Sequence, residues 1–111
     1  MKVGFTGSRS ATILNEKILD LLEGVCDDDI IIHGGARGAD TLIAEYCKLH
    51  KIKQEIIRPI NSVSENYLRR NIEIITKCDK LIAYWDGKSR GTKFTIDYAK
   101  ARNKEVIIVR I

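Results

Sequence analysis

Few of the residues that mark special classes of protein occur in this 111-residue sequence. Its three cysteines, Cys26, Cys47 and Cys78, lie far apart and form no Cys-x-x-Cys pair, which argues against a disulfide framework and a zinc site. We expect each of them to pack as a small apolar side chain. Only two histidines are present, and neither has a second ligand at a metal-site spacing. The sequence therefore predicts neither a metal site nor a bound cofactor.

Long apolar runs are also lacking, since no stretch approaches the roughly 20 residues that cross a bilayer. Residues 1–6 show no signal-peptide pattern, so we expect a cytoplasmic protein with no membrane partner. The hydrophobic content of 44% and charged content of 31% are typical of one ordered globular domain over residues 1–111. The net charge of +4 favours anionic partners without choosing between nucleic acid and small phosphates.

Two common nucleotide-binding motifs are missing. The pattern G-x-G-x-x-G would need glycine at position 33, where the chain has His33. No G-x-x-x-x-G-K-[ST] pattern occurs either. The sequence therefore gives little support to NAD binding or ATP hydrolysis.

A glycine-rich stretch at residues 34–40, with the sequence GGARGAD, is the most informative feature that is present. It follows a short apolar run and precedes a helical pattern that starts at residue 41. Glycines let a ligand approach the backbone, and a helix that begins there directs unpaired N–H groups at the turn. Arg37 adds planar donors suited to a phosphate or carboxylate. We predict a site for an anionic, nucleotide-like small molecule; a tight turn with one surface arginine is the alternative.

Apolar stretches alternate with helical patterns along the whole chain. Strands are expected at residues 2–6, 30–33, 54–58, 79–85 and 105–111, and helices at about 11–24, 40–49, 62–75 and 92–102. The expected helix caps are Ser8 or Ser10, then Asp40, and then a capping box of Ser62 and Glu65. The strands are continuously apolar, which predicts an α/β fold with a doubly wound, five-stranded parallel sheet in three layers, α/β/α.

The loops after several strands are expected to meet. In a doubly wound sheet, ligands bind beyond the carboxyl ends of the strands where the strand order reverses. With the common order 3-2-1-4-5, residues 7–10 and 86–92 flank one crevice, and residues 34–40 lie alongside. This juxtaposition favours a ligand site over a set of unrelated turns.

Four ordered motifs carry a resemblance to a known superfamily. They are Gly7-Ser8-Arg9, the stretch at residues 34–40, Arg70-Asn71, and WDGKSRGT at residues 85–92. Together they resemble the SLOG superfamily of Rossmann-like domains, in particular a small branch of bacterial and phage proteins with GSR and GGARGAD motifs. The resemblance covers nearly the whole chain. It implies a Rossmann-like homodimer that binds nucleotides, nucleotide-derived signals or related anions in the crevice.

Relatives in the superfamily include the LOG phosphoribohydrolases, which are enzymes, and the DNA-processing protein A domain, which binds single-stranded DNA. The hydrolases carry P-G-G-x-G-T-x-x-E, and aligning Gly91-Thr92 puts Thr95 where the catalytic glutamate would be. Threonine supplies no carboxylate to stabilise a sugar cation. We therefore favour a protein without turnover, with Asp40, Asp86 or Glu73 as the carboxylates able to stand in for the glutamate.

Several candidate residues have a second interpretation. Asp40 fits a helix cap better than a ligand contact, although it can accept from a ribose hydroxyl. Trp85 suits base stacking, a core position or a dimer interface equally. His33 is expected to be a satisfied core histidine. The resemblance and the loops together indicate the following ligand-binding set: Gly7, Ser8, Arg9, Gly34, Gly35, Ala36, Arg37, Gly38, Asp40, Arg70, Asn71, Trp85, Gly87, Lys88, Ser89, Gly91 and Thr92.

Three functions remain in competition. The leading hypothesis is a module that senses or sequesters a nucleotide-derived or other phosphate-bearing small molecule. The first alternative is an N-glycosidic hydrolase of nucleoside monophosphates. The second is single-stranded nucleic-acid binding, which the net charge permits although no basic strip is interleaved with aromatic residues.

Overall fold

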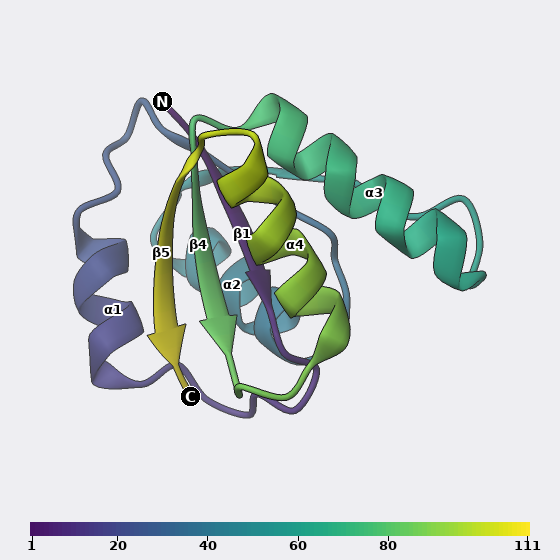
Figure 1. Cartoon of the computed structure of the whole chain (residues 1–111). Coiled ribbons are helices and arrows are strands. Elements are labelled where there is room, and N and C mark those ends of the chain that lie inside the picture. The colour runs from purple at the N-terminus through teal and green to yellow at the C-terminus, as the bar shows by residue number, and fades with distance from the viewer.

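Five parallel strands form one sheet in the order β3-β2-β1-β4-β5 (Figure 1). The computed structural model describes the backbone of residues 1–111 and every side chain except that of Ser64. The order confirms the expected reversal between β1 and β4. The strands are β1 (Lys2–Gly7), β2 (Ile30–His33), β3 (Lys53–Ile56), β4 (Lys80–Trp85) and β5 (Glu105–Arg110).

Four helices cover the two faces of this sheet. Side chains of α1 (Glu16–Glu23) and α2 (Ala39–Leu49) share one apolar cluster with β1 and β2. Helices α3 (Ser64–Lys77) and α4 (Arg90–Ala101) contact each other and cover the opposite face (Figure 1). One apolar cluster there joins both helices to β4, and another joins α3 to β2. The three-layer, Rossmann-like α/β architecture predicted from the sequence is therefore confirmed.

Alternate residues of the central strand β4 serve the two layers. Leu81 packs with Ile75 and Ala99 beneath α3 and α4. Ile82 and Tyr84 point the other way and join the cluster of α1 and α2. Because successive side chains of a strand point to opposite faces, a strand covered on both sides has to be apolar throughout.

Helix α1 begins later than its apolar periodicity suggested. The expected helix over residues 11–24 forms only from Glu16, and its cap is Asn15, whose side chain accepts a hydrogen bond from the Ile18 N–H. Tyr84 explains the delay. Its hydroxyl accepts from the Asn15 N–H at 2.9 Å and donates to the Ile13 carbonyl at 2.9 Å, so β4 holds the preceding segment outside the helix.

The other expected boundaries shift by a few residues. The capping box does not form, since α3 follows Val63 and has no side-chain cap bond. Helix α4 starts at Arg90, before the expected residue 92, and β3 ends at Ile56. Cys47 and Cys78 are buried as expected, whereas Cys26 is exposed.

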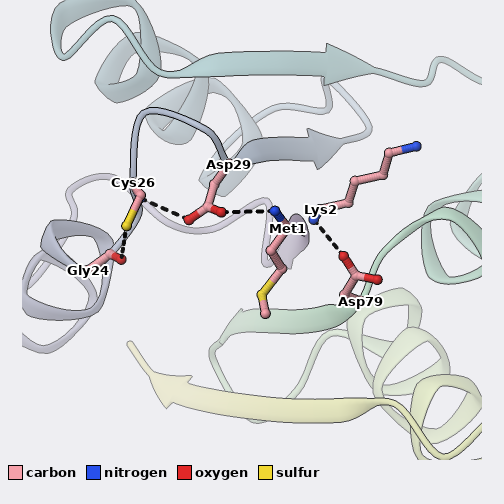
Figure 2. A network of polar contacts seen from close by, with 6 residues as sticks. All are labelled: Met1, Lys2, Gly24, Cys26, Asp29 and Asp79. Atoms are coloured by element: carbon pink, nitrogen blue, oxygen red, sulfur yellow. Dashed lines mark hydrogen bonds and ion pairs between the residues drawn. The ribbon is translucent and has the colours of Figure 1, made fainter.

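The beginning of β1 is tied to both neighbouring strands (Figure 2). The amino group of Met1 pairs with Asp29 at 3.1 Å, just before β2. The Lys2 N–H donates to Asp79 at 2.7 Å, just before β4. Asp29 also accepts from the Cys26 N–H at 2.9 Å. Charged groups thus connect the amino ends of three strands, opposite the edge where the candidate site lies.

Over the described residues, none of the helices combines the length and apolar character needed to cross a bilayer.

Candidate functional site

The loop after β1 joins the loops after β2 and β4. The Ser8 carbonyl accepts from the Ala39 N–H at 3.1 Å, at the start of α2. The Ser8 hydroxyl accepts from the Asp86 N–H at 3.0 Å, and Ser10 donates to the Asp86 carboxylate at 2.8 Å. These bonds confirm that turns distant in the sequence meet at the carboxyl ends of the strands.

Close backbone approach makes this junction possible. Gly38 has φ of 77°, and a Cβ there would lie 2.5 Å from the Arg9 carbonyl oxygen. A Cβ at Gly7 would overlap Ala39 and approach the Tyr84 carbonyl oxygen to 2.8 Å. These glycines let the loops pack together, and Gly7 also lines the crevice that the loops form with α3.

A crevice of about 630 Å³ opens where the three loops meet helix α3. Its walls come from the end of β1, the three loops, the face of α3 and the first turn of α4. The lining residues are Phe5, Thr6, Gly7, Arg9, Ser10, Ala36, Asp40, Tyr67, Leu68, Arg70, Asn71, Ile74, Ser89, Arg90, Gly91 and Thr92.

Positive charge dominates this lining. It includes Arg9, Arg70 and Arg90, and among the described lining residues Asp40 is the only carboxyl. Helix α4 adds the positive end of its dipole, and its first turn holds no acidic residue, although the Asp86 carboxylate accepts from the Ser89 N–H just before the helix at 2.8 Å. Arg90 in that turn is unfavourable for helix stability, since cations are stabilising at the other end. The arrangement suits an anion that arrives from outside.

Arg70 is fixed at the inner wall of the crevice. Its Nη1 donates to the Gly34 carbonyl at 2.6 Å and its Nε to Asn71 at 2.8 Å. A Cβ on Gly34 would overlap this guanidinium, so glycine is what admits it. The guanidinium also lies 5.6 Å from the ring centre of Tyr67, and that of Arg9 lies 5.1 Å from the same ring. The guanidinium groups of Arg9 and Arg70 thus both lie within cation–π distance of the Tyr67 ring.

Asp40 faces Arg70 across the loop after β2 and is only 6% exposed. It does not cap α2, whose N-cap is Gly38. Its Oδ2 instead accepts from the N–H groups of Gly34 at 3.2 Å and Ala36 at 3.1 Å. Its Oδ1 is buried and has no partner among the described atoms. Burial raises the pKa of this carboxyl, against the opposing effects of the Ala36 N–H and the charge of Arg70.

Some predicted binding residues lie outside the lining and hold the loops in shape. Gly35 has φ of 65°, and its N–H donates to the His33 ring at 3.1 Å. The other nitrogen of His33 is 2.8 Å from Gln54, so this histidine is satisfied within the core as expected. Ser8, Gly34 and Gly38 act as described above, and Arg37 and Lys88 are exposed outside the lining.

Trp85 braces the loop after β4 and does not line the crevice. Its indole N–H donates to the Ser89 carbonyl at 3.1 Å, and the Arg110 guanidinium lies 6.0 Å from its ring centre. Gly87, with φ of 82°, makes room for the same guanidinium. Of the two aromatic residues in the lining, Phe5 is buried in the core at 1% exposure and Tyr67 is half-buried, so Tyr67 offers its ring to a ligand; the loop motifs did not indicate it.

Sequence reasoning missed part of the lining because it concentrated on loops. Tyr67 stands three residues before Arg70 and so shares its helix face, as Ile74 does one turn later. That spacing is the signal that would have found them. Leu68 follows the apolar periodicity of the same helix, which predicts a core position, yet it is 37% exposed and lines the crevice. The remaining residues that were missed are Phe5, Thr6 and Ser10, which flank Gly7-Ser8-Arg9, and Arg90, which lies within the motif at residues 85–92.

The position that aligns with the catalytic glutamate of the hydrolases holds Thr95, which is not accessible from the crevice. Thr95 is fully buried, and its hydroxyl donates to the Gly91 carbonyl at 2.9 Å, one turn earlier in α4. Asp97 is exposed and pairs with Lys93 at 2.8 Å. The threonine therefore shapes the helix behind the crevice.

Two of the three carboxylates that could substitute for the hydrolase glutamate, Asp86 and Glu73, interact with other groups of the protein. Asp86 accepts from the N–H groups of Lys88 and Ser89, each at 2.8 Å, and these bonds are the main reason why its pKa is lowered. Glu73 is exposed and lies 3.7 Å from Lys77. Asp40 is left as the carboxyl that faces the crevice. Within the part of the chain that the structure describes, no three acidic, histidine or cysteine side chains gather as metal ligands.

Comparison with known proteins shows the fold. No protein-family model matches the chain, and no curated protein matches it. Among solved structures, DNA processing protein A (DprA) from Streptococcus pneumoniae is similar, with a TM-score of 0.77 and 17% sequence identity. The match covers 96% of this chain and 49% of that one, so the chain spans about half the length of its structural neighbour. The chain thus shares a Rossmann-like α/β fold with DprA.

Proposed function

We propose that this chain is a binding module that holds a nucleotide-derived or other phosphate-bearing small molecule in the crevice, as a sensor or a sequestering protein. The observation that carries the proposal is the charge of the lining, where Arg9, Arg70 and Arg90 oppose one carboxyl. Guanidinium groups and free helix N–H groups are the donors that phosphates prefer. The volume of about 630 Å³ lies within the range of roughly 300–1,000 Å³ common for ligand sites.

The motifs that resemble those of the SLOG superfamily support the same proposal, because members of that superfamily are expected to bind nucleotides, nucleotide-derived signals or related anions in the corresponding crevice. Tyr67, Leu68 and Ile74 give the α3 wall apolar surface as well. A ligand with a phosphate and a flat apolar part would use both kinds of surface. Inorganic phosphate has no apolar part and would use only the charged surface.

Thermal unfolding tests the proposal. The purified protein is heated with AMP, ADP-ribose, cyclic AMP or inorganic phosphate, each at several concentrations. A ligand present at about 100 times its dissociation constant should add about 2.7 kcal/mol to the free energy of unfolding. Stabilisation by one or more of the nucleotides is the expected result. If none of these compounds changes the melting temperature at millimolar concentration, the proposal is wrong.

A pair of arginine variants places the ligand. Arg90→Ala removes a lining charge and should weaken nucleotide binding by about tenfold, the value of one charge-assisted hydrogen bond. Arg102→Ala removes an exposed charge at the opposite end of α4, outside the lining, and is the matched control. Equal weakening by both variants would mean that net charge, and not the crevice, determines affinity.

Hydrolysis of the N-glycosidic bond of nucleoside monophosphates is the first alternative. It is favoured by Asp40, the carboxyl that lines the crevice with an unpartnered oxygen. Incubation with AMP, followed by chromatography for free adenine, decides between turnover and binding. Adenine release that Asp40→Asn abolishes would replace the binding-module proposal with an enzymatic function.

Single-stranded nucleic-acid binding is the second alternative, and the structural neighbour named for DNA processing supports it. The net charge of +4 is compatible with it. Tight binding to an oligonucleotide, with an affinity that falls steeply as salt rises, would favour this function. A preference for mononucleotides with a shallow salt dependence would favour the crevice.

A further inference from the structure

The crevice contains one buried hydrogen-bond acceptor that the protein itself does not satisfy. Oδ2 of Asp40 is engaged by two backbone N–H groups, and Oδ1 has no partner among the described atoms. Buried carboxylate oxygens are nearly always hydrogen-bonded, because an unpaired one loses its hydration without compensation. Since Asp40 lines the crevice, the missing donor can be a ligand group, or an ordered water that a ligand group displaces.

The surrounding charges restrict what that donor is. Arg70 lies close enough to oppose the rise in the pKa of Asp40, and Arg9 and Arg90 line the same crevice. A metal ion or an ammonium group would meet three guanidinium groups and one carboxyl. A neutral donor, such as a hydroxyl, avoids that repulsion and still pairs with Oδ1.

Arg70 favours a hydroxyl in particular. Its hydrogen bonds to the described residues use Nε and Nη1. The residue lines the crevice, as Asp40 does. A hydroxyl both donates and accepts, so it can donate to the Asp40 carboxyl and accept from Nη2 of Arg70. Two neighbouring hydroxyls of a sugar each offer one donor and one acceptor of this kind.

We propose that Asp40 makes the crevice selective for a ribose phosphate unit whose 2′- and 3′-hydroxyls are free, either in ribose 5-phosphate itself or in a ribonucleoside 5′-phosphate. This inference rests on the proposed function, since the phosphate is taken to lie at the first turn of α4. Asp40 lies in the first turn of α2, which follows the loop after β2, and α4 follows the loop after β4, so the two lie on either side of the β1 loop. A sugar that spans the crevice would reach both.

Burial supports this role in a second way. The raised pKa of Asp40 means that its charged form is disfavoured in the empty crevice. A sugar hydroxyl that donates to Oδ1 stabilises the charged carboxylate. The free energy of binding therefore includes the relief of a buried oxygen that lacks a protein donor in the empty crevice. Residues that reduce stability in this way are characteristic of functional sites.

Calorimetric titration with a set of matched ligands tests the inference. The ligands are AMP, 2′-deoxy-AMP, 3′-deoxy-AMP, ribose 5-phosphate and inorganic phosphate. The wild-type protein should bind AMP about tenfold more tightly than at least one deoxy analogue, as expected for loss of one hydrogen bond to a charged group. Comparable binding of ribose 5-phosphate and AMP would identify the sugar phosphate as the recognised unit, and much tighter binding of AMP would identify the whole nucleotide.

The Asp40→Asn variant supplies the decisive comparison. Asparagine keeps an acceptor for the Gly34 and Ala36 N–H groups but presents a donor where Oδ1 stood, so AMP and its deoxy analogues should bind within about twofold of one another. Asp97→Asn removes a carboxylate that lies on the exposed side of α4 and should keep the wild-type preference. Melting temperatures establish that both variants are folded, and if Asp40→Asn is not, the wild-type series alone decides.

The outcomes separate the two claims. Equal wild-type affinity for AMP and both deoxy analogues overturns the selectivity of Asp40 and leaves phosphate binding in place. A preference that survives in Asp40→Asn assigns the recognition to another residue and also overturns the inference. No binding of any phosphate compound overturns the proposed function and this inference with it.

Discussion

Gly34 is the residue on which the inner wall of the crevice depends. Its missing side chain admits the Arg70 guanidinium, which then donates to the Gly34 carbonyl at 2.6 Å. The sequence indicated Gly34 and Arg70 separately, as ligand contacts. Their contact with each other was not predictable, because it joins residues 36 positions apart and needs the folded sheet.

Gly34→Ala should therefore destabilise the fold by about 1–3 kcal/mol, as expected when a methyl group is forced into packed structure. The matched control is Gly91→Ala, because a Cβ there meets nothing within 4 Å. Urea unfolding measures both. Equal free energies of unfolding for Gly34→Ala and wild type would contradict the proposed packing of Arg70.

Asp86 should make the fold sensitive to acid. Hydrogen bonds from the N–H groups of Lys88 and Ser89 lower its pKa below the ordinary value of 3.8. A carboxyl with a lowered folded-state pKa contributes stability above the unfolded value, and this contribution is lost as the pH falls through the folded-state pKa.

Stability should consequently fall less steeply below pH 3.8 in Asp86→Asn than in the wild type, while the variant is less stable at pH 7. Denaturant unfolding at a series of pH values between about 2 and 7 measures both quantities. Parallel curves for the two proteins would show that Asp86 has the same pKa in the folded and unfolded chains.

At the scale of single elements, periodicity predicted each helix and strand but not where the helices begin. The apolar pattern of α1 extends back to Leu14, yet the helix starts at Glu16. The hydroxyl of Tyr84, 69 positions from Asn15 in the sequence, holds the preceding segment. Tertiary bonds of this kind override local propensity and cannot be read from a pattern.

Asn15→Ala should cost about 1 kcal/mol or somewhat more. The variant loses the cap bond to the Ile18 N–H at 3.0 Å and the side-chain bond to the Arg110 carbonyl at 3.1 Å. Ser62→Ala is the control, because this exposed serine was the expected cap of α3 and the helix begins after Val63 instead. Thermal unfolding that ranks Ser62→Ala as the more damaging change would contradict this assignment of the caps.

At the scale of the whole molecule, the alternation of strands and helices was sufficient to predict the parallel sheet. Its strand order was taken from the common doubly wound arrangement, which the structure has, and the meeting of the three loops follows from that order. Parallel strands have few alternative arrangements once the crossovers are right-handed and the ligand edge is at the strand reversal. The crevice was predictable only in part. Its α3 wall, with Tyr67 and Ile74, depends on how that helix lies across β1, which no loop motif encodes.

The central claim, that a phosphate-bearing ligand binds where the loops after β1, β2 and β4 meet, is tested most directly by nuclear magnetic resonance. AMP is titrated into the ¹⁵N-labelled protein and the backbone amide signals are followed. We expect the largest shifts at residues 90–92, with further shifts at residues 7–10 and 36–40. Shifts concentrated in the smaller groove beside Tyr46 and His50, or no shifts at millimolar AMP, would contradict the account.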